Sequence, residues 1–304
     1  MKRREFIIRG LGGSAAALAL GKYGNLIAAP AKGTVDSCQL VAVRGGEPAT
    51  MFDKAIEVYG GMGTFVKKGQ RVLVKPNIGW DTEPERAGDT HPMLVKRVIE
   101  HCFNAGAKEV FVFDHTCDTW TQCYRNSGIE RAAKDAGAIV VSGASEGSYQ
   151  DVSIPAAKRL RRAKVHEQLL NADVFINVPV LKHHHASRVT IGMKNMMGVV
   201  WDRGAWHQND LHQCIADFST YRKPDLVIVD AYNVMKQNGP RGVSPADLVQ
   251  MKAQLVSTDP FIADVAAAKL YGIEPDDVRY LAIGASMGLG KLELDQASIK
   301  RIKL

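Results

Sequence analysis

Residues 71–75 read Arg-Val-Leu-Val-Lys, and residues 226–230 read Leu-Val-Ile-Val-Asp. Each is a short run of mainly β-branched apolar residues that ends in one charged residue. Unbroken apolar runs of this length are typical of strands that helices bury on both faces, as in parallel sheets. Six more short runs are candidate strands: 39–43, 109–114, 138–142, 174–178, 254–257 and 278–283.

Helical patterns lie between these candidate strands. Residues 91–104 place apolar side chains at three- and four-residue spacing and stop before Gly106. Residues 129–136 and 262–271 are each followed directly by a glycine. This alternation predicts an α/β fold, a doubly wound and mostly parallel sheet with helices on both faces. Ligands bind such sheets beyond the carboxyl ends of the strands, so the polar residues just after each strand are the site candidates.

Basic and amide side chains gather at these positions. A lysine ends the strand at 71–75, and further basic and amide residues follow the strands that end near 178 and 230. Cations gathered at one sheet edge suit a carboxylate or a phosphate. The sequence therefore predicts a substrate-binding set for a small anionic molecule: Lys75, Asn77, Lys182, Asn195 and Arg241.

Seven of the nine histidines fall in predicted loops or at element ends. We expect His91, His184 and Lys194 to be the catalytic residues, because imidazole and amine groups carry protons in enzymes. Imidazoles near aspartates also suit a metal ion, and the candidate ligands are His183, His184, His115, His207 and Asp114. Along an extended segment His183 and His184 face opposite ways, so at most two of residues 183–185 share a metal.

Each of these interpretations has a structural alternative. The histidine run at 183–185 could be a solvated loop, Asp114 and His115 could cap a helix, and residues 194–195 could lie on a helix surface. For Ser257-Thr258-Asp259-Pro260 the structural role is favoured, an N-cap followed by proline at the first helical position.

The five cysteines form no C-x-x-C pair, which argues against a built-in iron–sulfur cluster. Cys117 and Cys123 could form a short disulfide in an oxidising compartment. The sequence has no P-loop, no G-x-G-x-x-G after a strand, no G-x-S-x-G and no H-E-x-x-H. A metal ion is the cofactor that the histidines suggest, and its identity stays open.

Residues 1–31 have the layout of an export signal. A basic start, MKRREFIIRG, precedes a Gly/Ala-rich apolar stretch at 11–20 and the small-residue site Ala29-Pro30-Ala31. The apolar stretch is shorter than the ~20 residues that span a bilayer. Arg3 and Arg4, followed by Phe6, resemble a twin-arginine signal. We expect cleavage near Ala31 and a single periplasmic α/β domain at 32–304, delivered by the twin-arginine export machinery.

The whole chain has 39 basic and 32 acidic residues, a net charge of +7. Removing residues 1–31 takes away five basic residues and one acid, which leaves 34 against 31 and a net charge of +3. This near balance argues against a nucleic-acid partner. With 46% hydrophobic and 23% charged residues, the composition also excludes a disordered or coiled-coil chain.

Six segments together resemble the domain of unknown function 362 family, in the family's order: 74–77, 90–92, 172–179, 181–184, 190–195 and 257–260. The sequence departs from the family pattern at His183, where threonine is usual between Lys182 and His184. The resemblance implies an α/β domain, in some relatives fused to ferredoxin-like modules whose cysteines this chain lacks. It implies no particular reaction.

We therefore expect an exported periplasmic enzyme, metal-dependent and linked to redox chemistry, that acts on a small anionic substrate. The alternative is a non-catalytic periplasmic protein that binds a small anion or docks on a periplasmic redox protein.

Overall fold

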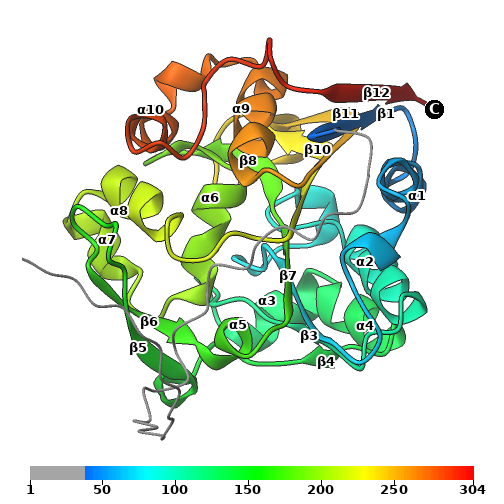
Figure 1. The fold of residues 1–304 in the computed structure, drawn as a ribbon, viewed down its shortest axis with the longest axis horizontal. Coiled ribbons are helices and arrows are strands. Elements are labelled where there is room, and N and C mark those ends of the chain that lie inside the picture. The colour runs from blue at the N-terminus through cyan, green and yellow to red at the C-terminus, as the bar shows by residue number, and fades with distance from the viewer. Residues whose placement is uncertain (1–37) are drawn as a thin grey trace, which may run out of the picture. The chain divides into compact units, whose positions relative to one another are not determined.

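The apolar runs form the middle of a sheet (Figure 1) in a computed structural model that describes residues 38–304. The predicted signal peptide lies outside these residues. Within them the sheet has ten strands. Its centre is β10 (Leu226–Met235), β7 (Val174–Val178), β2 (Arg71–Pro76) and β3 (Glu109–Val112), which lie side by side and parallel.

The remaining strands extend this centre on both sides. β4 (Ile139–Val140) continues it in parallel next to β3. On the other side β11 (Leu248–Ser257) pairs antiparallel with β10 and with β1 (Leu40–Arg44), and β12 (Ile299–Lys303) pairs parallel with β1. β8 (Val180–His184) pairs parallel with β10 and antiparallel with β9 (Arg188–Thr190). The predicted α/β fold with a mostly parallel sheet is confirmed.

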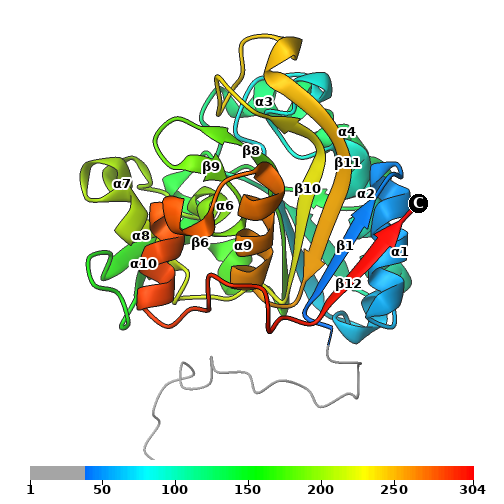
Figure 2. The same ribbon diagram turned by 90° about the horizontal axis from the view of Figure 1, so that it is seen from above.

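Helices cover both faces of the sheet. Figure 2 shows α1 (Pro48–Val58) and α2 (Pro92–Asn104) on one side, and α6 (Gly192–Asn195), α8 (Leu211–Phe218), α9 (Pro260–Tyr271) and α10 (Arg279–Ser286) on the other. Strand alternation supplies both cores. Val72 and Val74 of β2 pack with α1 and α2, whereas Leu73 between them packs with the second group.

The other elements are α3 (Trp120–Asn126), α4 (Ile129–Asp135), α5 (Glu167–Leu170), α7 (Gly204–Gln208) and the hairpin of β5 (Tyr149–Ser153) with β6 (Arg162–His166). Six short 3₁₀ helices complete the described residues: Met62–Thr64, Pro84–Arg86, Glu146–Ser148, Met196–Val199, Pro245–Asp247 and Pro275–Asp277. No helix in residues 38–304 combines the length and the apolar character that a membrane span needs.

The helix ends follow the predicted signals. The Asp259 carboxylate accepts hydrogen bonds from the backbone N–H groups of Phe261 and Ile262, so Asp259 is the N-cap of α9. The helix ends at Gly272, whose φ of 92° lies in the left-handed region that glycine adopts without strain. The capping role favoured for Asp259 is therefore confirmed.

Residues 278–283, predicted as a strand, form the start of α10 instead. Tyr280, Leu281 and Gly284 are buried at helical spacing, and a short apolar run does not distinguish this pattern from a strand. The strands predicted at 226–230 and 254–257 are longer than expected. Five strands were not predicted: β5, β6, β8, β9 and β12.

Candidate functional site

A cavity of about 320 Å³ lies beyond the carboxyl ends of β2 and β3 and beside β8. Pockets that hold small ligands have volumes from roughly 300 Å³ upward. The cavity is lined by Asn77, Gly79, Trp80, Asp114, Cys117, Lys182, His184, Thr190, Lys194, Asn195, Met197, Gly198, Arg203, Gly204, His207 and Pro240. The cavity therefore lies where ligands bind in α/β sheets, beyond the carboxyl ends of the strands.

Asn195 of α6 is fixed by side chains from two parallel strands. Lys75 of β2 and Asn177 of β7 are register partners, and both point to the α6 face of the sheet. The Asn195 Oδ1 accepts hydrogen bonds from Lys75 Nζ at 3.1 Å and from Asn77 Nδ2 at 2.9 Å. Its Nδ2 donates to Asn177 Oδ1 at 2.8 Å. The amide predicted to bind substrate is thus also a structural link between α6 and the sheet.

Lys75 lies beneath the cavity and is not part of its lining. Its Nζ is 2.9 Å from Asp114 Oδ1, and the two side chains are 0% and 3% exposed. The Lys75 ammonium also donates to Pro76 O at 2.7 Å, and Asp114 Oδ2 accepts from Ile78 N at 2.7 Å. Burial lowers the pKa of Lys75 and the Asp114 charge opposes that shift. Lys75, predicted to bind substrate, therefore forms a buried ion pair below the cavity.

Lys182 reaches the cavity because the β8 side chains alternate. Lys182 and His184 point into it, and His183 between them points away and accepts a hydrogen bond from Gly239 N at 3.0 Å. The Lys182 Nζ donates to Asn77 Oδ1 at 3.0 Å and to Gly88 O. Burial lowers the pKa of Lys182. The predicted opposite orientation of His183 and His184 is confirmed.

Lys194 has neither a hydrogen-bond acceptor nor an ion-pair partner among residues 38–304. Its side chain is partly exposed, and it lines the cavity. Burial lowers the pKa of Lys194 to about 8, and the charges of Arg203, Lys182 and Lys75 shift it in the same direction. At neutral pH the amine is therefore protonated and lacks a protein counter-ion.

The backbone determines the tautomer of His184. Its Nδ1 accepts hydrogen bonds from Ala186 N at 3.1 Å and Ser187 N at 3.3 Å, so the proton of the neutral ring is on Nε2. Burial lowers the pKa of His184 to about 2, and Lys194 and Lys182 contribute. The ring is a neutral hydrogen-bond donor at the cavity, and in this tautomer Nε2 has no lone pair for a metal.

Arg203 forms one wall of the cavity. Its guanidinium donates to the backbone oxygens of His115 and Thr116, and Nη2 lies 3.5 Å from the sulfur of Cys117. Two of its five N–H donors therefore serve the neighbouring loop, and others remain for a ligand. His207 of α7 also lines the cavity and is exposed.

Three other predicted site residues lie outside the lining. His91 is the N-cap of α2, where Nδ1 accepts from Met93 N at 3.2 Å. His115 stacks on Trp201, with ring centroids 4.9 Å apart. Arg241 is largely exposed and lies 3.7 Å from an oxygen of Asp118. The structure therefore brings together Asn77, Lys182, His184, Lys194, Asn195, His207 and Asp114 from the predicted set.

The predicted metal ligands do not converge. In residues 38–304 no group of three or more His, Cys, Asp or Glu side chains is arranged to hold a metal ion. His183 and His184 point to opposite sides of β8. His115 stacks on Trp201 outside the cavity lining, and Asp114 forms an ion pair with Lys75. The five cysteines all lie in this range and are free, Cys117 exposed and Cys123 buried.

Nine residues of the lining were not predicted, and four of them bear on the chemistry of the site: Cys117, Thr190, Gly198 and Arg203. Cys117 comes after β3, and Arg203 comes directly before α7. Neither chain position by itself indicated a ligand-binding residue. Thr190 is buried, and its hydroxyl has no hydrogen-bond partner within the described residues. At Gly198, an added Cβ would lie 1.7 Å from Asp114 Oδ1 and 2.7 Å from Lys75 Nζ. Glycine is required there because the ion pair fills the space of a side chain.

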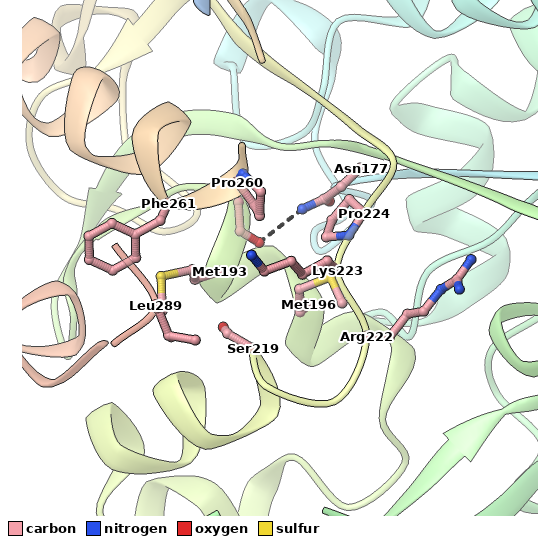
Figure 3. Close-up of a pocket in the computed structure, with 11 residues that line it drawn as sticks. Asn177, Met193, Met196, Ser219, Arg222, Lys223, Pro224, Pro260, Phe261 and Leu289 are labelled. Atoms are coloured by element: carbon pink, nitrogen blue, oxygen red, sulfur yellow. Dashed lines mark hydrogen bonds between the residues drawn. The ribbon is translucent and has the colours of Figure 1, made fainter. Parts of the chain in front are cut away.

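The opposite side of α6 packs into the core. Figure 3 shows Met193 beside Phe261 and Leu289, and Met196 near Lys223, around a pocket of about 20 Å³. The buried Asp264 of α9 accepts hydrogen bonds from Gly192 N at 2.8 Å and Met193 N at 2.9 Å. This short helix is therefore held at its first turn and on one side, while Lys194 and Asn195 face the cavity.

The fold and the cavity define an α/β protein with a cation-lined site at the carboxyl edge of its sheet. The chain belongs to the family described as "Domain of unknown function (DUF362)", whose model matches residues 72–269. It is also similar to the "Thylakoid-associated protein sll1697" of Synechocystis sp., with 28% identity over 242 residues, 77% of this chain and 73% of that protein.

Among solved structures, the chain is similar to the lactate racemase apoprotein from Thermoanaerobacterium thermosaccharolyticum. The TM-score is 0.47 and the sequence identity 12%, and the match covers 77% of this chain. It spans 57% of the length of that racemase chain.

Proposed function

We propose that the cavity binds a small anion that carries a carboxylate or a phosphate, and that Lys194 and His184 act on it. The observation that carries the proposal is the Lys194 amine, which lines the cavity and has no acceptor among residues 38–304. An unpaired cation in a partly buried site is unfavourable until an anion joins it. A ligand anion would provide the counter-charge that the protein does not.

The other charges of the cavity support an anion rather than a cation. Lys182, Lys194 and Arg203 line it, and Asp114 is the one acid among the described lining residues. Asp114 is already paired with Lys75, and the charge of the buried Asp89 acts on Lys182, so Lys194 and Arg203 are the cations with the least compensation. Charge-assisted hydrogen bonds from such groups are the strong contacts for carboxylates and phosphates.

His184 supplies a different interaction. Because the neutral ring presents Nε2–H, it can donate to an oxygen of the ligand without adding charge. This geometry supports a role as a hydrogen-bond donor to an oxygen that gains negative charge during the reaction. The expected metal dependence has no support in the described residues, and the proposal does not include it.

The test is calorimetric titration of the purified chain with oxalate, pyruvate and inorganic phosphate. Lys194→Met should lower the affinity for the preferred anion by about tenfold or more, the scale of a hydrogen bond to a charged group. Lys236→Met is the matched control, because Lys236 is also partly buried but donates to Tyr271 O outside the cavity. Unchanged affinity in Lys194→Met, or no binding of any of the three anions, would refute the proposal.

We also propose that the chain is exported by the twin-arginine route and works in the periplasm, where a redox protein is a candidate partner. The support is the sequence of residues 1–31, with Arg3 and Arg4 before Phe6. Cell fractionation of the native host tests it. Replacing both arginines with lysine should leave the chain in the cytoplasm, and unaltered export would contradict the proposal.

A further inference from the structure

We propose that Lys194 forms an imine with a small 2-oxo acid, so that the substrate has a carbonyl group beside its carboxylate. This inference rests on the anion-binding function proposed above and adds the group that reacts. It starts from a difference among the cations of the site: only some have their hydrogen bonds satisfied by the protein.

Three of these cations already have protein acceptors, although Arg203 keeps further N–H donors for a ligand. Lys75 is paired with Asp114, Lys182 donates to Asn77 and Gly88, and Arg203 donates to two backbone oxygens and approaches Cys117. Lys194 has no such partner among residues 38–304, and it lines the same cavity. Its nitrogen is therefore available to a ligand on the open side.

Neighbouring positive charge favours the neutral form of Lys194. Burial lowers its pKa to about 8, and Arg203, Lys182 and Lys75 act in the same direction. A lysine becomes a nucleophile when it is desolvated or lies beside other cations, because the lone pair on nitrogen is then free at moderate pH. Of these three cations, Arg203 and Lys182 also line the cavity and can face the carboxylate of the substrate.

A second polar group points to a ligand at the same place. Thr190 is 3% exposed and lines the cavity, and its Oγ1 has no hydrogen-bond partner in the described part of the chain. It is the cross-strand partner of Lys182 in the β8–β9 pair, so the two side chains lie on the same face of this strand pair. Together they fit a carboxylate, and the Nε2–H of His184 fits a carbonyl oxygen.

The reaction is balanced without an oxidant or a reductant. The neutral Lys194 amine attacks the carbonyl carbon, a C–N bond forms, and the proton lost from nitrogen passes to the oxygen. The resulting carbinolamine takes up a proton and loses water as the C–O bond breaks, which leaves the iminium. The positive nitrogen then accepts the electron pair of a C–H bond on the carbon next to the iminium carbon. A proton is lost there, and the iminium becomes a neutral enamine.

The experiment traps this species with pyruvate and sodium cyanoborohydride. Hydride reduces the iminium to a stable secondary amine, and peptide mass spectrometry locates it. We expect one adduct, on Lys194, and none on Lys236, whose pKa burial also lowers but which lies outside the cavity. Lys194→Arg keeps a positive charge and should lose the adduct. Lactate, which has the carboxylate and no carbonyl, should slow the trapping of pyruvate.

Calorimetric titration with pyruvate and lactate separates failure of this inference from failure of the proposed function. If pyruvate binds and no adduct forms on Lys194, the imine is overturned and anion binding stands. If neither acid binds and no adduct forms, the imine is overturned, and the proposed function fails with it only if oxalate and inorganic phosphate do not bind either. Adducts spread over surface lysines without preference for Lys194 would also overturn the imine. Circular dichroism of Lys194→Arg establishes that a lost adduct does not reflect unfolding.

Discussion

The ammonium of Lys75 lies 2.9 Å from the carboxylate of Asp114, with both side chains almost fully removed from solvent. This pair joins the end of β2 to the segment after β3 and forms the floor below the cavity. Two residues that the sequence suggested for ligand binding thus hold the site together. Removing one partner leaves an uncompensated buried charge, which costs far more than the loss of a surface pair.

We predict that Asp114→Ala lowers the free energy of unfolding by about 3–5 kcal/mol, the usual cost of breaking a buried ion pair from one side. Urea denaturation measures it. The double variant Lys75→Met with Asp114→Ala should be less destabilised than the sum of the single variants, because it leaves no unpaired ammonium. Strict additivity would show that the pair contributes nothing as a pair.

Gly198→Ala should destabilise the protein by about 1–3 kcal/mol, the range for overpacking a filled site. The new Cβ would lie 1.7 Å from Asp114 Oδ1, so the ion pair must move. Gly204→Ala is the control, because Gly204 lines the same cavity but has no atom within 4 Å of an added Cβ. The midpoint temperatures of thermal unfolding of the two variants test this. Equal midpoints would show that Asp114 and Lys75 can move without loss of stability.

Anion affinity should fall as the pH rises through about 8. The pKa of Lys194 in the free protein is about 8, so the amine is protonated below this pH and neutral above it. A bound anion favours the protonated form, and the affinity is therefore greatest on the acidic side. Lys194→Arg stays charged and should remove the Lys194 part of this dependence between pH 7 and about 9, whereas Lys182, whose pKa is also about 8, should still contribute. Titrations of oxalate across this range test it, and an unchanged profile in the variant would assign the proton to another group.

His184→Ala should weaken anion binding by up to about tenfold, the upper end of the range of about 0.5–1.5 kcal/mol for one hydrogen bond. His91→Ala should leave the affinity unchanged and lower the stability by about 0.5–2 kcal/mol, because His91 caps α2. The comparison pairs one histidine that lines the cavity with one that does not. A larger loss of affinity in the His91 variant would contradict the assigned positions.

Asp264→Ala should loosen α6 and weaken anion binding, although Asp264 does not line the cavity. Its carboxylate accepts two backbone hydrogen bonds at the start of the helix that carries Lys194. Leaving these buried N–H groups unpaired costs about 1–3 kcal/mol each. Asp264→Asn keeps one acceptor oxygen and should retain more of both stability and affinity. Equal effects of the two variants would argue against this role.

Much of the fold follows from local patterns. The apolar runs at 71–75 and 174–178 are strands because such residues bury both faces, and Asp259 with Pro260 starts a helix through capping. The error at 278–283 arose because a short apolar run has no decisive period. The β5–β6 hairpin carries exposed and polar side chains on both strands, so its burial pattern is weak in the sequence.

The site was predicted in part for similarly local reasons. Alternation along an extended segment correctly separates His183 from His184, since successive residues face opposite ways. His91, His115 and Arg241 also follow strand ends, yet their side chains serve a helix cap, a stacked ring pair and a surface contact. Chain position alone does not distinguish these roles.

The sequence by itself determined the class of fold, the edge of the sheet where the site lies, and the predominance of cations there. These features depend on residue type and on periods of two and 3.6, which act over a few residues. Only the tertiary structure decided which cations have an N–H group that is free to bind a ligand. Lys75 is bonded to Asn195, 120 positions away, whereas Lys194 is left without an acceptor among the described residues. That distinction depends on distances between side chains of separate helices and strands. These distances exist only once the elements pack together.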